Sequence, residues 1–144
     1  MVTIGEAVTV FAPAEKVFNY LSEPSNLPEI WPSLVEVTDI QSLPDGGYSA
    51  RWKYKMAGRI FKGRAVHTEI VPNKIIVIKT GGGINSTITW KFRTRANRTR
   101  VTFTVEYNIP VPLLGKLAET IIAKMNEQEM VLVMSNLRAR FMLA

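Results

Sequence analysis

The only histidine of the chain, His67, and the nearby Glu69 have the residue types and the spacing that proton transfer requires. Side chains two residues apart in an extended strand point to the same face. An imidazole beside a carboxylate can accept and return a proton, as a dehydration or a cyclisation requires. The alternative is a histidine satisfied by a hydrogen bond or an ion pair at the rim of a sheet. We therefore assign no catalytic residue and keep His67 and Glu69 as the candidates to test.

The remaining composition excludes several kinds of chemistry. The chain contains no cysteine, so disulfides, thiolate catalysis and cysteine-held metals are ruled out. With His67 as the sole histidine and no cluster of acidic residues, we expect neither a metal nor a cofactor. The sequence contains no run of ~18 uncharged apolar residues, so we predict no membrane span. The M-V-T-I-G-E start lacks the pattern of a signal peptide, so we expect a cytoplasmic protein.

Aromatic side chains recur at alternate positions through the middle of the chain. In Y-S-A-R-W-K-Y-K-M, for example, Tyr48, Trp52 and Tyr54 alternate with polar residues. Such alternation is typical of antiparallel strands with one buried and one solvent-facing side. The aromatic residues predicted on the buried side are Tyr48, Trp52, Tyr54, Phe61, Trp90, Phe92, Phe103 and Tyr107. They form either a solid core or the wall of a ligand pocket.

An α+β order of elements positions these residues. A strand at 2–11 precedes two short helices within 14–30, the second of them between prolines around 25–30. Period-two alternation then runs from 34 to 109 with short turns, which predicts about six strands joined as hairpins. From about 113 to the end the spacing is helical. This last helix is the only element large enough to cover the apolar face of the sheet.

The last helix carries apolar residues on two sides near its C-terminal end. At ~100° per residue, Leu132, Asn136 and Ala139 share one face. The opposite face carries Met130, Met134, Leu137 and Phe141. A surface helix needs only one apolar stripe. We therefore expect the first face to look into the sheet and the second to rest on the short helices.

Several motifs resemble one known superfamily. They are V-T-V-F-A-P-A-E-K-V-F-N-Y-L, N-L-P-E-I-W-P-S-L-V-E-V, the E-I-V-P-N turn, and W-K-F followed by T-R-V-T-F-T-V-E-Y. Together they resemble the START-like helix-grip superfamily (SRPBCC), in particular its polyketide cyclase/dehydrase and lipid-transport branch. The resemblance implies a single α+β helix-grip domain over residues 1–144. In that fold a curved antiparallel sheet of about six to seven strands wraps around the long C-terminal helix.

The same resemblance implies an apolar cavity between the curved sheet and the long helix. On the helix face predicted to look into the sheet, Ala118, Ala139 and the polar Asn136 accompany larger residues. Small and polar residues there leave space and need hydrogen-bond partners, which a filled core would avoid. We therefore expect Asn136 to be a polar anchor. The predicted ligand-binding cavity comprises Trp52, Tyr54, Phe61, Ala65, His67, Trp90, Phe92, Phe103, Tyr107, Ile121, Met125, Leu132 and Asn136.

Much of the positive charge falls on the solvent-facing side of the predicted sheet. The basic residues assigned to it are Arg51, Lys53, Lys55, Lys62, Arg64, Lys91, Arg93, Arg95 and Arg100. The simplest interpretation is a solvated face that also discourages pairing between sheet edges. A sharper hypothesis is peripheral contact with an anionic membrane, which salt would weaken. No RNA-binding motif accompanies the charge, so we do not expect a nucleic-acid partner.

Members of the superfamily include lipid and quinone carriers, polyketide cyclases, hormone binders and partners of chaperones or ribosomes, so the fold alone does not give the function. We expect this protein to bind and carry a hydrophobic small molecule, such as a lipid, an isoprenoid quinone or a polyketide-like compound. The alternative is a polyketide cyclase or dehydratase that depends on His67 or Glu69. A third hypothesis is an adaptor that binds a membrane, a ribosome or a protein through the basic face.

Overall fold

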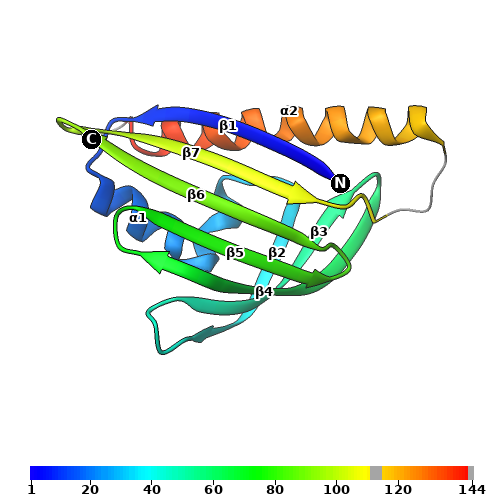
Figure 1. Ribbon diagram of the computed structural model, residues 1–144, viewed down its shortest axis with the longest axis horizontal. Coiled ribbons are helices and arrows are strands. Elements are labelled where there is room, and N and C mark those ends of the chain that lie inside the picture. Colours follow the sequence, from blue (N-terminus) through cyan, green and yellow to red (C-terminus); the bar gives the residue numbers. More distant parts are fainter. Residues whose placement is uncertain (111–114, 143–144) are drawn as a thin grey trace.

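The computed structural model describes residues 1–110 and 115–142. Within them, seven strands form one antiparallel sheet. The strands are β1 (Val2–Val10), β2 (Leu34–Ser42), β3 (Tyr48–Met56), β4 (Arg59–Val71), β5 (Ile75–Gly82), β6 (Ser86–Arg95) and β7 (Arg98–Tyr107). Their order across the sheet is β1-β7-β6-β5-β4-β3-β2 (Figure 1). Strands β2 to β7 are therefore consecutive hairpins, as predicted, and β1 pairs beside β7.

The hairpin between β3 and β4 shows how the sequence fixes the register of the sheet. Met56 pairs with Arg59, so only Ala57 and Gly58 form the turn. Both have positive φ angles, 53° and 75°. This is the geometry of two-residue hairpins whose twist matches that of the flanking strands, and Gly58 adopts it at little steric cost. The turn thereby sets the side-chain parity of two strands that carry much of the candidate site.

Two short helices follow β1, as predicted. They are α1 (Ala14–Ser22) and the 3-10 helix η1 (Pro24–Glu29). In α1, Val17, Phe18 and Leu21 lie at helical spacing and are buried. This face packs against the sheet at β6 and β7. The short helices therefore close one end of the sheet.

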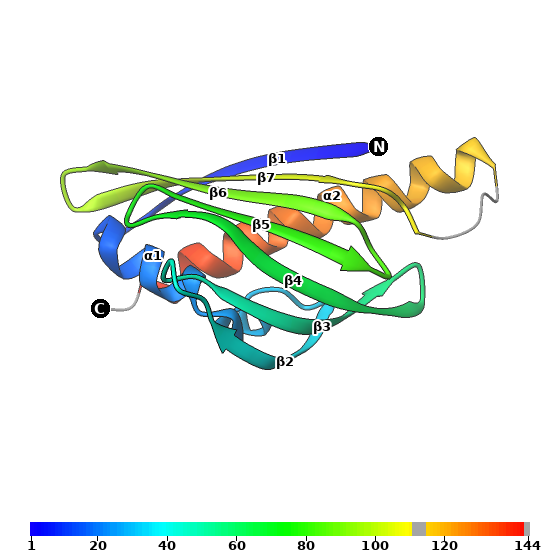
Figure 2. The same cartoon turned by 60° about the horizontal axis from the view of Figure 1, so that its bottom comes forward.

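The long helix α2 (Lys116–Arg140) runs beside β1 and crosses the concave side of the sheet (Figures 1 and 2). The predicted start of this helix near residue 113 lies outside the described residues. None of the described helices combines the length and the apolar character needed to cross a membrane. The predicted arrangement of a curved sheet around a long helix is confirmed.

The prediction that α2 has two covered faces is wrong. The buried residues of α2 are Met130, Val133, Met134 and Leu137. Their spacing of i, i+3, i+4 and i+7 makes a single stripe, and Met130 lines the space inside the sheet. Leu132, which was expected there, is 46% exposed, and Ala139 is exposed too. The face predicted to rest on the short helices is the buried one, and at its end Phe141 packs on Tyr20 of α1 with ring centroids 5.6 Å apart. The expectation failed for the other face, which is exposed at Leu132 and Ala139.

Candidate functional site

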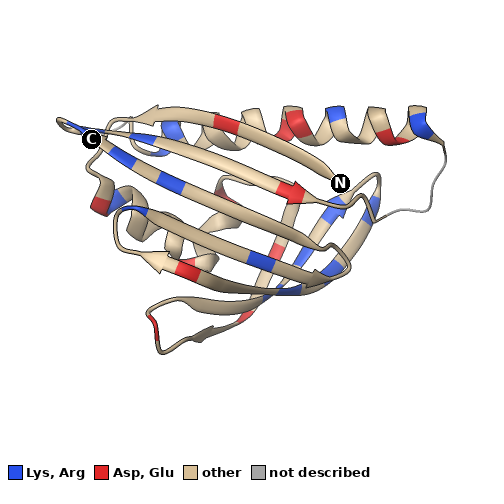
Figure 3. Ribbon diagram, viewed as in Figure 1, with Lys and Arg blue, Asp and Glu red and all other residues tan. Residues whose placement is uncertain are grey.

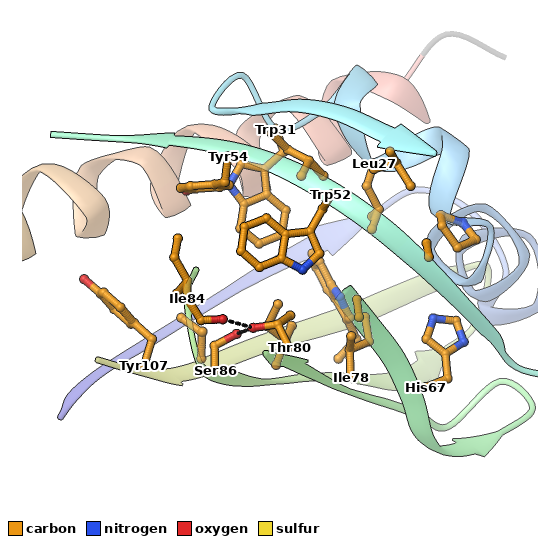
Figure 4. Close-up of a pocket in the computed structure, with 18 of the residues that line it drawn as sticks. Leu27, Trp31, Trp52, Tyr54, His67, Ile78, Thr80, Ile84, Ser86 and Tyr107 are labelled. Atoms are coloured by element: carbon orange, nitrogen blue, oxygen red, sulfur yellow. Dashed lines mark hydrogen bonds between the residues drawn. The ribbon is translucent and has the colours of Figure 1, made fainter. Parts of the chain in front are cut away.

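An internal cavity of about 130 Å³ lies between the concave side of the sheet and α2. Side chains from η1, α2 and all seven strands line it, and most of them are apolar (Figure 4). Met56 and Asn126 also border a second cavity of about 120 Å³, which lies between α2 and the β3–β4 hairpin. An apolar cavity of about 150 Å³ is known to take up benzene. The main cavity therefore suits a single aromatic ring, and a longer molecule would reach past Met56 and Asn126.

All three tryptophans of the chain line this cavity. Trp31 donates its indole N–H to the hydroxyl of Tyr54 at 3.1 Å. Trp90 is fully buried and packs edge-on against Phe103, with ring centroids 4.7 Å apart. Among the described residues, no group accepts a hydrogen bond from the indole N–H of Trp52 or of Trp90. The wall is thus aromatic, with two buried donors that lack a protein partner.

A glycine on the neighbouring strand allows Trp52 its position. Gly63 pairs with Trp52 across β3 and β4. A Cβ atom at residue 63 would lie 2.5 Å from the indole ring and 2.1 Å from the carbonyl oxygen of Gly81. Neither separation is compatible with van der Waals contact. The absence of a side chain at Gly63 therefore lets the indole pack directly on the backbone of β4.

His67 lies at one end of the cavity and Tyr107 at the other (Figure 4). The Nδ1 atom of His67 accepts a hydrogen bond from the backbone N–H of Tyr48 at 3.1 Å, so the neutral ring carries its proton on Nε2. Burial lowers the pKa of His67 below its usual 6.5, against the opposing influence of Asp45 and Glu23. At neutral pH this side chain is an uncharged group whose Nε2–H donates to no other residue in the described part of the chain.

The predicted pairing of His67 with Glu69 is wrong. A β-bulge interrupts the register between β4 and β5, so that His67 pairs with Ile78 while Glu69 pairs with Val77. The extra residue, Thr68, moves the alternation of side chains by one position. His67 is consequently buried, whereas Glu69 is exposed. The carboxylate that would complete a proton relay with His67 faces away from the cavity.

The cavity wall also contains polar groups from β5 and β6, and further polar groups at the end of the cavity that α2 borders. Thr80 donates its hydroxyl hydrogen to the carbonyl oxygen of Ile84 at 2.9 Å, and the hydroxyls of Thr80 and Ser86 lie 2.6 Å apart. Because Thr80 has only one hydrogen to donate, Ser86 is the donor in this pair and its oxygen keeps free lone pairs. Asn126 donates from Nδ2 to the hydroxyl of Tyr107 at 2.6 Å. Burial raises the pKa of that hydroxyl.

Part of the predicted residue set meets at the cavity. The residues that line it are Trp52, Tyr54, Ala65, His67, Trp90 and Tyr107. Phe92 and Phe103 are buried behind the wall, where Phe92 packs on Phe18 and Phe103 packs on Trp90. Phe61 is partly buried against the core. Strand parity thus predicted correctly that these aromatic side chains point inward. It does not predict which of them line the cavity and which belong to the packed core behind it.

The residues predicted on α2 do not line the main cavity, although Met125 borders the second one. Ile121, Met125 and Leu132 are 52%, 56% and 46% exposed. The Nδ2 atom of Asn136 donates to the backbone carbonyl of Ile30 at 3.0 Å. Asn136 therefore ties α2 to the end of η1 and is not an anchor inside the cavity. These expectations failed because the helix turns the stripe of Met130, Val133, Met134 and Leu137 inward, and not the face that carries Leu132.

Several cavity residues were missed by sequence reasoning. Asn126 and Met130, one helical turn apart, make the contribution of α2. Thr80 and Ser86 share the strand parity of neighbouring buried isoleucines, so alternation could have identified them. Trp31 follows η1 in an irregular segment. No periodicity there indicates the direction of a side chain.

The basic residues of the outer sheet face are at the surface, as predicted (Figure 3). On β3, Arg51 lies 3.5 Å from a carboxylate oxygen of Asp39 on β2. On β6 and β7, Arg93 lies directly across from Arg100. Like charges in this position destabilise a sheet slightly. The charge of β3 is therefore partly neutralised within the protein, while β6 and β7 present a more strongly positive surface.

The curved antiparallel sheet, the long helix and the apolar space between them define a protein of the helix-grip class. Residues 1–142 match the family described as polyketide cyclase / dehydrase and lipid transport. The chain belongs to this family, and the resemblance stated from its sequence motifs is confirmed. A comparison with curated proteins gives no match.

Solved structures share the fold at low sequence identity. The Zhui aromatase/cyclase from Streptomyces sp. R1128 has a TM-score of 0.81 at 19% identity, over 96% of this chain and 92% of that one. A START superfamily protein from Mycobacterium smegmatis has a TM-score of 0.74 at 16% identity, over 96% of each chain. The Aha1 dimer from Colwellia psychrerythraea gives 0.65 at 16%, over 99% of this chain and 98% of that one. At such identities the likeness establishes the fold alone.

Proposed function

We propose that this protein binds and carries a hydrophobic small molecule, such as a lipid, an isoprenoid quinone or a polyketide-like compound, in its internal cavity. The observation that supports this most directly is the cavity itself, which is lined mainly by aromatic and aliphatic side chains from every strand. Burial of apolar ligand surface there contributes ~25 cal/mol per Å². The lack of cysteine fits a reducing compartment such as the cytoplasm.

The arrangement of the polar groups favours binding over catalysis. A dehydration or cyclisation needs a paired acid and base within reach of the substrate. The bulge at Thr68 turns Glu69 outward and leaves His67 without that partner. His67, Tyr107 and Ser86 are instead spread along the cavity wall. Such single polar groups orient a ligand without supplying a relay.

Native mass spectrometry of the protein purified from its own host tests the proposal, together with extraction of any bound compound. We expect a co-purifying apolar molecule, and binding of some members of a lipid and quinone panel. Ala65→Phe places a ring in the cavity and should abolish binding. The matched control Val66→Phe, on the outward side of the same strand, should not. The absence of any ligand from both the native protein and the panel would contradict a binding function.

A cyclase or dehydratase is the second candidate, because the Nε2 proton of neutral His67 is available at the cavity. His67→Gln separates the two functions. For a carrier, ligand affinity should stay within a fewfold of the unchanged protein, and no turnover should be found. A measurable turnover of a polyketide-like substrate that disappears in this variant would favour the enzyme instead.

We further propose that the basic sheet face contacts an anionic membrane during ligand transfer. In the described part of the chain, the ion pairs on the sheet join only β2 and β3, which leaves the cations of β6 and β7 available to lipid phosphates. Each such cation contributes about 1 kcal/mol near an anionic surface. Arg93→Gln should therefore weaken co-sedimentation with anionic vesicles by about fivefold, whereas Arg51→Gln, which removes an already paired charge, should have less effect. Co-sedimentation that ignores both anionic lipid and salt would contradict this contact.

A further inference from the structure

One exposed aromatic side chain, Phe11, lies among the basic residues at one end of the sheet. It follows Val10, the last residue of β1, which is fully buried. Because side chains alternate along a strand, Phe11 points to the outer face of the sheet, where it is 41% exposed. The Cζ atoms of Arg98 and Arg138 lie 5.0 and 5.5 Å from the centre of its ring. Strand β7 and helix α2 thus each place an arginine against the same ring.

The contact with Phe11 orients both guanidinium groups without neutralising them. A guanidinium group is attracted to the face of an aromatic ring and keeps its N–H groups for other partners. Within the described residues, neither Arg98 nor Arg138 forms an ion pair with a carboxylate. Arg140, two residues after Arg138, differs in this respect, because it lies 2.7 Å from a carboxylate oxygen of Glu29. The two arginines at Phe11 therefore keep their charge available to an anion outside the protein.

Arginines also face one another across the β6–β7 hairpin beside Phe11. Arg95 pairs with Arg98 at the end of the hairpin. Arg93 pairs with Arg100 two residues further along. Figure 3 shows the basic residues of β6 and β7 gathered toward the turn that joins these strands. Like charges directly opposite each other destabilise a sheet, so an anionic partner at this end would relieve the repulsion.

We propose that this end of the molecule docks on an anionic lipid surface, with Phe11 inserted among the lipid head groups and Arg98 and Arg138 bonded to phosphates beside it. A bilayer interface offers phosphates and apolar surface side by side, which suits an aromatic ring flanked by two cations. The inference rests on the proposed contact between the basic sheet face and a membrane. It specifies which part of that face enters the bilayer.

Docking by this end leaves the far part of the outer sheet face in water. Val66 is 38% exposed there, and it points outward because its neighbours Ala65 and His67 line the cavity. Three strands separate β4 from β1. At ~4.8 Å per strand spacing, Val66 lies roughly 19 Å across the sheet from β1. It is therefore an exposed apolar control on the same face as Phe11.

The absence of cysteine from the chain allows a single label at a chosen position. Phe11→Cys and Val66→Cys, each carrying the fluorophore NBD, should be mixed with vesicles of phosphatidylglycerol and phosphatidylcholine in equal parts, and with vesicles of phosphatidylcholine alone. We expect the emission of the label at residue 11 to shift to shorter wavelength on the anionic vesicles, because that label leaves water. We expect no shift for the label at residue 66, and none for either label on neutral vesicles.

Unlabelled variants test whether the ring itself contributes to binding. In co-sedimentation with the anionic vesicles, Phe11→Ala should weaken binding by ~5- to 10-fold, because the variant loses apolar contact with the lipid. Phe11→Trp should bind at least as tightly as the unchanged protein, since tryptophan favours the membrane interface. Val66→Ala should leave binding unchanged. Thermal unfolding shows whether each variant is folded, which we expect because both side chains are partly exposed.

The outcomes separate the insertion of Phe11 from the membrane contact itself. If the protein co-sediments and both labels shift, the whole sheet face lies flat on the bilayer. If it co-sediments and neither label shifts, the contact uses charge alone. Either result overturns the insertion and leaves the membrane contact standing, whereas a lack of co-sedimentation of the unchanged protein overturns both. Binding of a soluble poly-glutamate peptide that Phe11→Ala weakens to the same extent would identify an acidic protein segment as the partner and overturn the assignment to lipid.

Discussion

At the scale of single residues, His67 combines two properties that make it informative. It is the only histidine of the chain, and it is 5% exposed. Its Nδ1 atom receives the backbone N–H of Tyr48, a bond that requires this nitrogen to be unprotonated. Protonation of the ring would therefore place a charge in a poorly solvated position and remove an acceptor from a backbone donor.

The burial of His67 predicts a specific dependence of stability on pH. The folded-state pKa of His67 lies below its usual value of 6.5. The unfolded chain therefore takes up the proton first, and the free energy of unfolding should fall as the pH is lowered below about 6.5, until the folded-state pKa is reached. His67→Asn, whose Oδ1 can accept from Tyr48, should remove the slope in this range. Denaturant unfolding between about pH 8 and pH 5 measures the pH dependence of stability for the unchanged protein and for the variant. Equal slopes in the two proteins would show that His67 is not the source of that dependence.

At the scale of elements, α2 buries one stripe and leaves its other faces to solvent. Leu137 is fully buried, whereas Leu132 is 46% exposed. Leu137→Ala should lower the free energy of unfolding by about 2–5 kcal/mol, because it leaves a cavity in a packed region. Leu132→Ala should lower it by less than about 1 kcal/mol. Urea unfolding of the pair measures the difference, and equal losses would mean that the buried face is assigned incorrectly.

The strands were predictable because apolar and polar residue types alternate along them with a period of two. Trp52 and Tyr54 alternate with cations, and their inward direction follows from parity alone. Parity fails where a bulge occurs, because Thr68 has no feature that marks it as an extra residue. Glu69 was consequently assigned to the wrong side of the sheet.

The face of the long helix was harder to predict, because both of its candidate faces are apolar. Its polar residues were ambiguous as well. Asn126 and Asn136 are both half-buried, but one bonds a hydroxyl at the cavity while the other bonds a backbone carbonyl of the chain after η1. That distinction depends on the rotation of the helix and on the position of η1, and neither is encoded locally. Trp31 was missed for a related reason, since only tertiary packing orients a side chain in an irregular segment.

At the scale of the whole molecule, the cavity lowers the stability of the fold, and the packing of the remaining core offsets this loss. A fully packed interior would gain dispersion contacts and would leave no donors unpaired. The cavity instead separates α2 from the sheet near Met130 and Trp52. Elsewhere the core is closely packed, as at α1, where Ala14 is 6% exposed. The two regions should therefore respond oppositely when a side chain is enlarged.

A pair of alanine substitutions tests this division. Ala65 lines the cavity, so Ala65→Leu should fill vacant volume and raise the free energy of unfolding by about 0.5–2 kcal/mol, as cavity-filling changes commonly do. Ala14 is the first residue of α1 and is buried in the packed region, so Ala14→Leu should instead lower the free energy of unfolding by about 1–3 kcal/mol. A ligand that enters the cavity should still stabilise Ala14→Leu but should no longer stabilise Ala65→Leu. Thermal unfolding with and without a one-ring compound such as acetophenone measures this difference. Equal destabilisation by both changes would mean that the space between α2 and the sheet is filled, and that no guest molecule can be bound there.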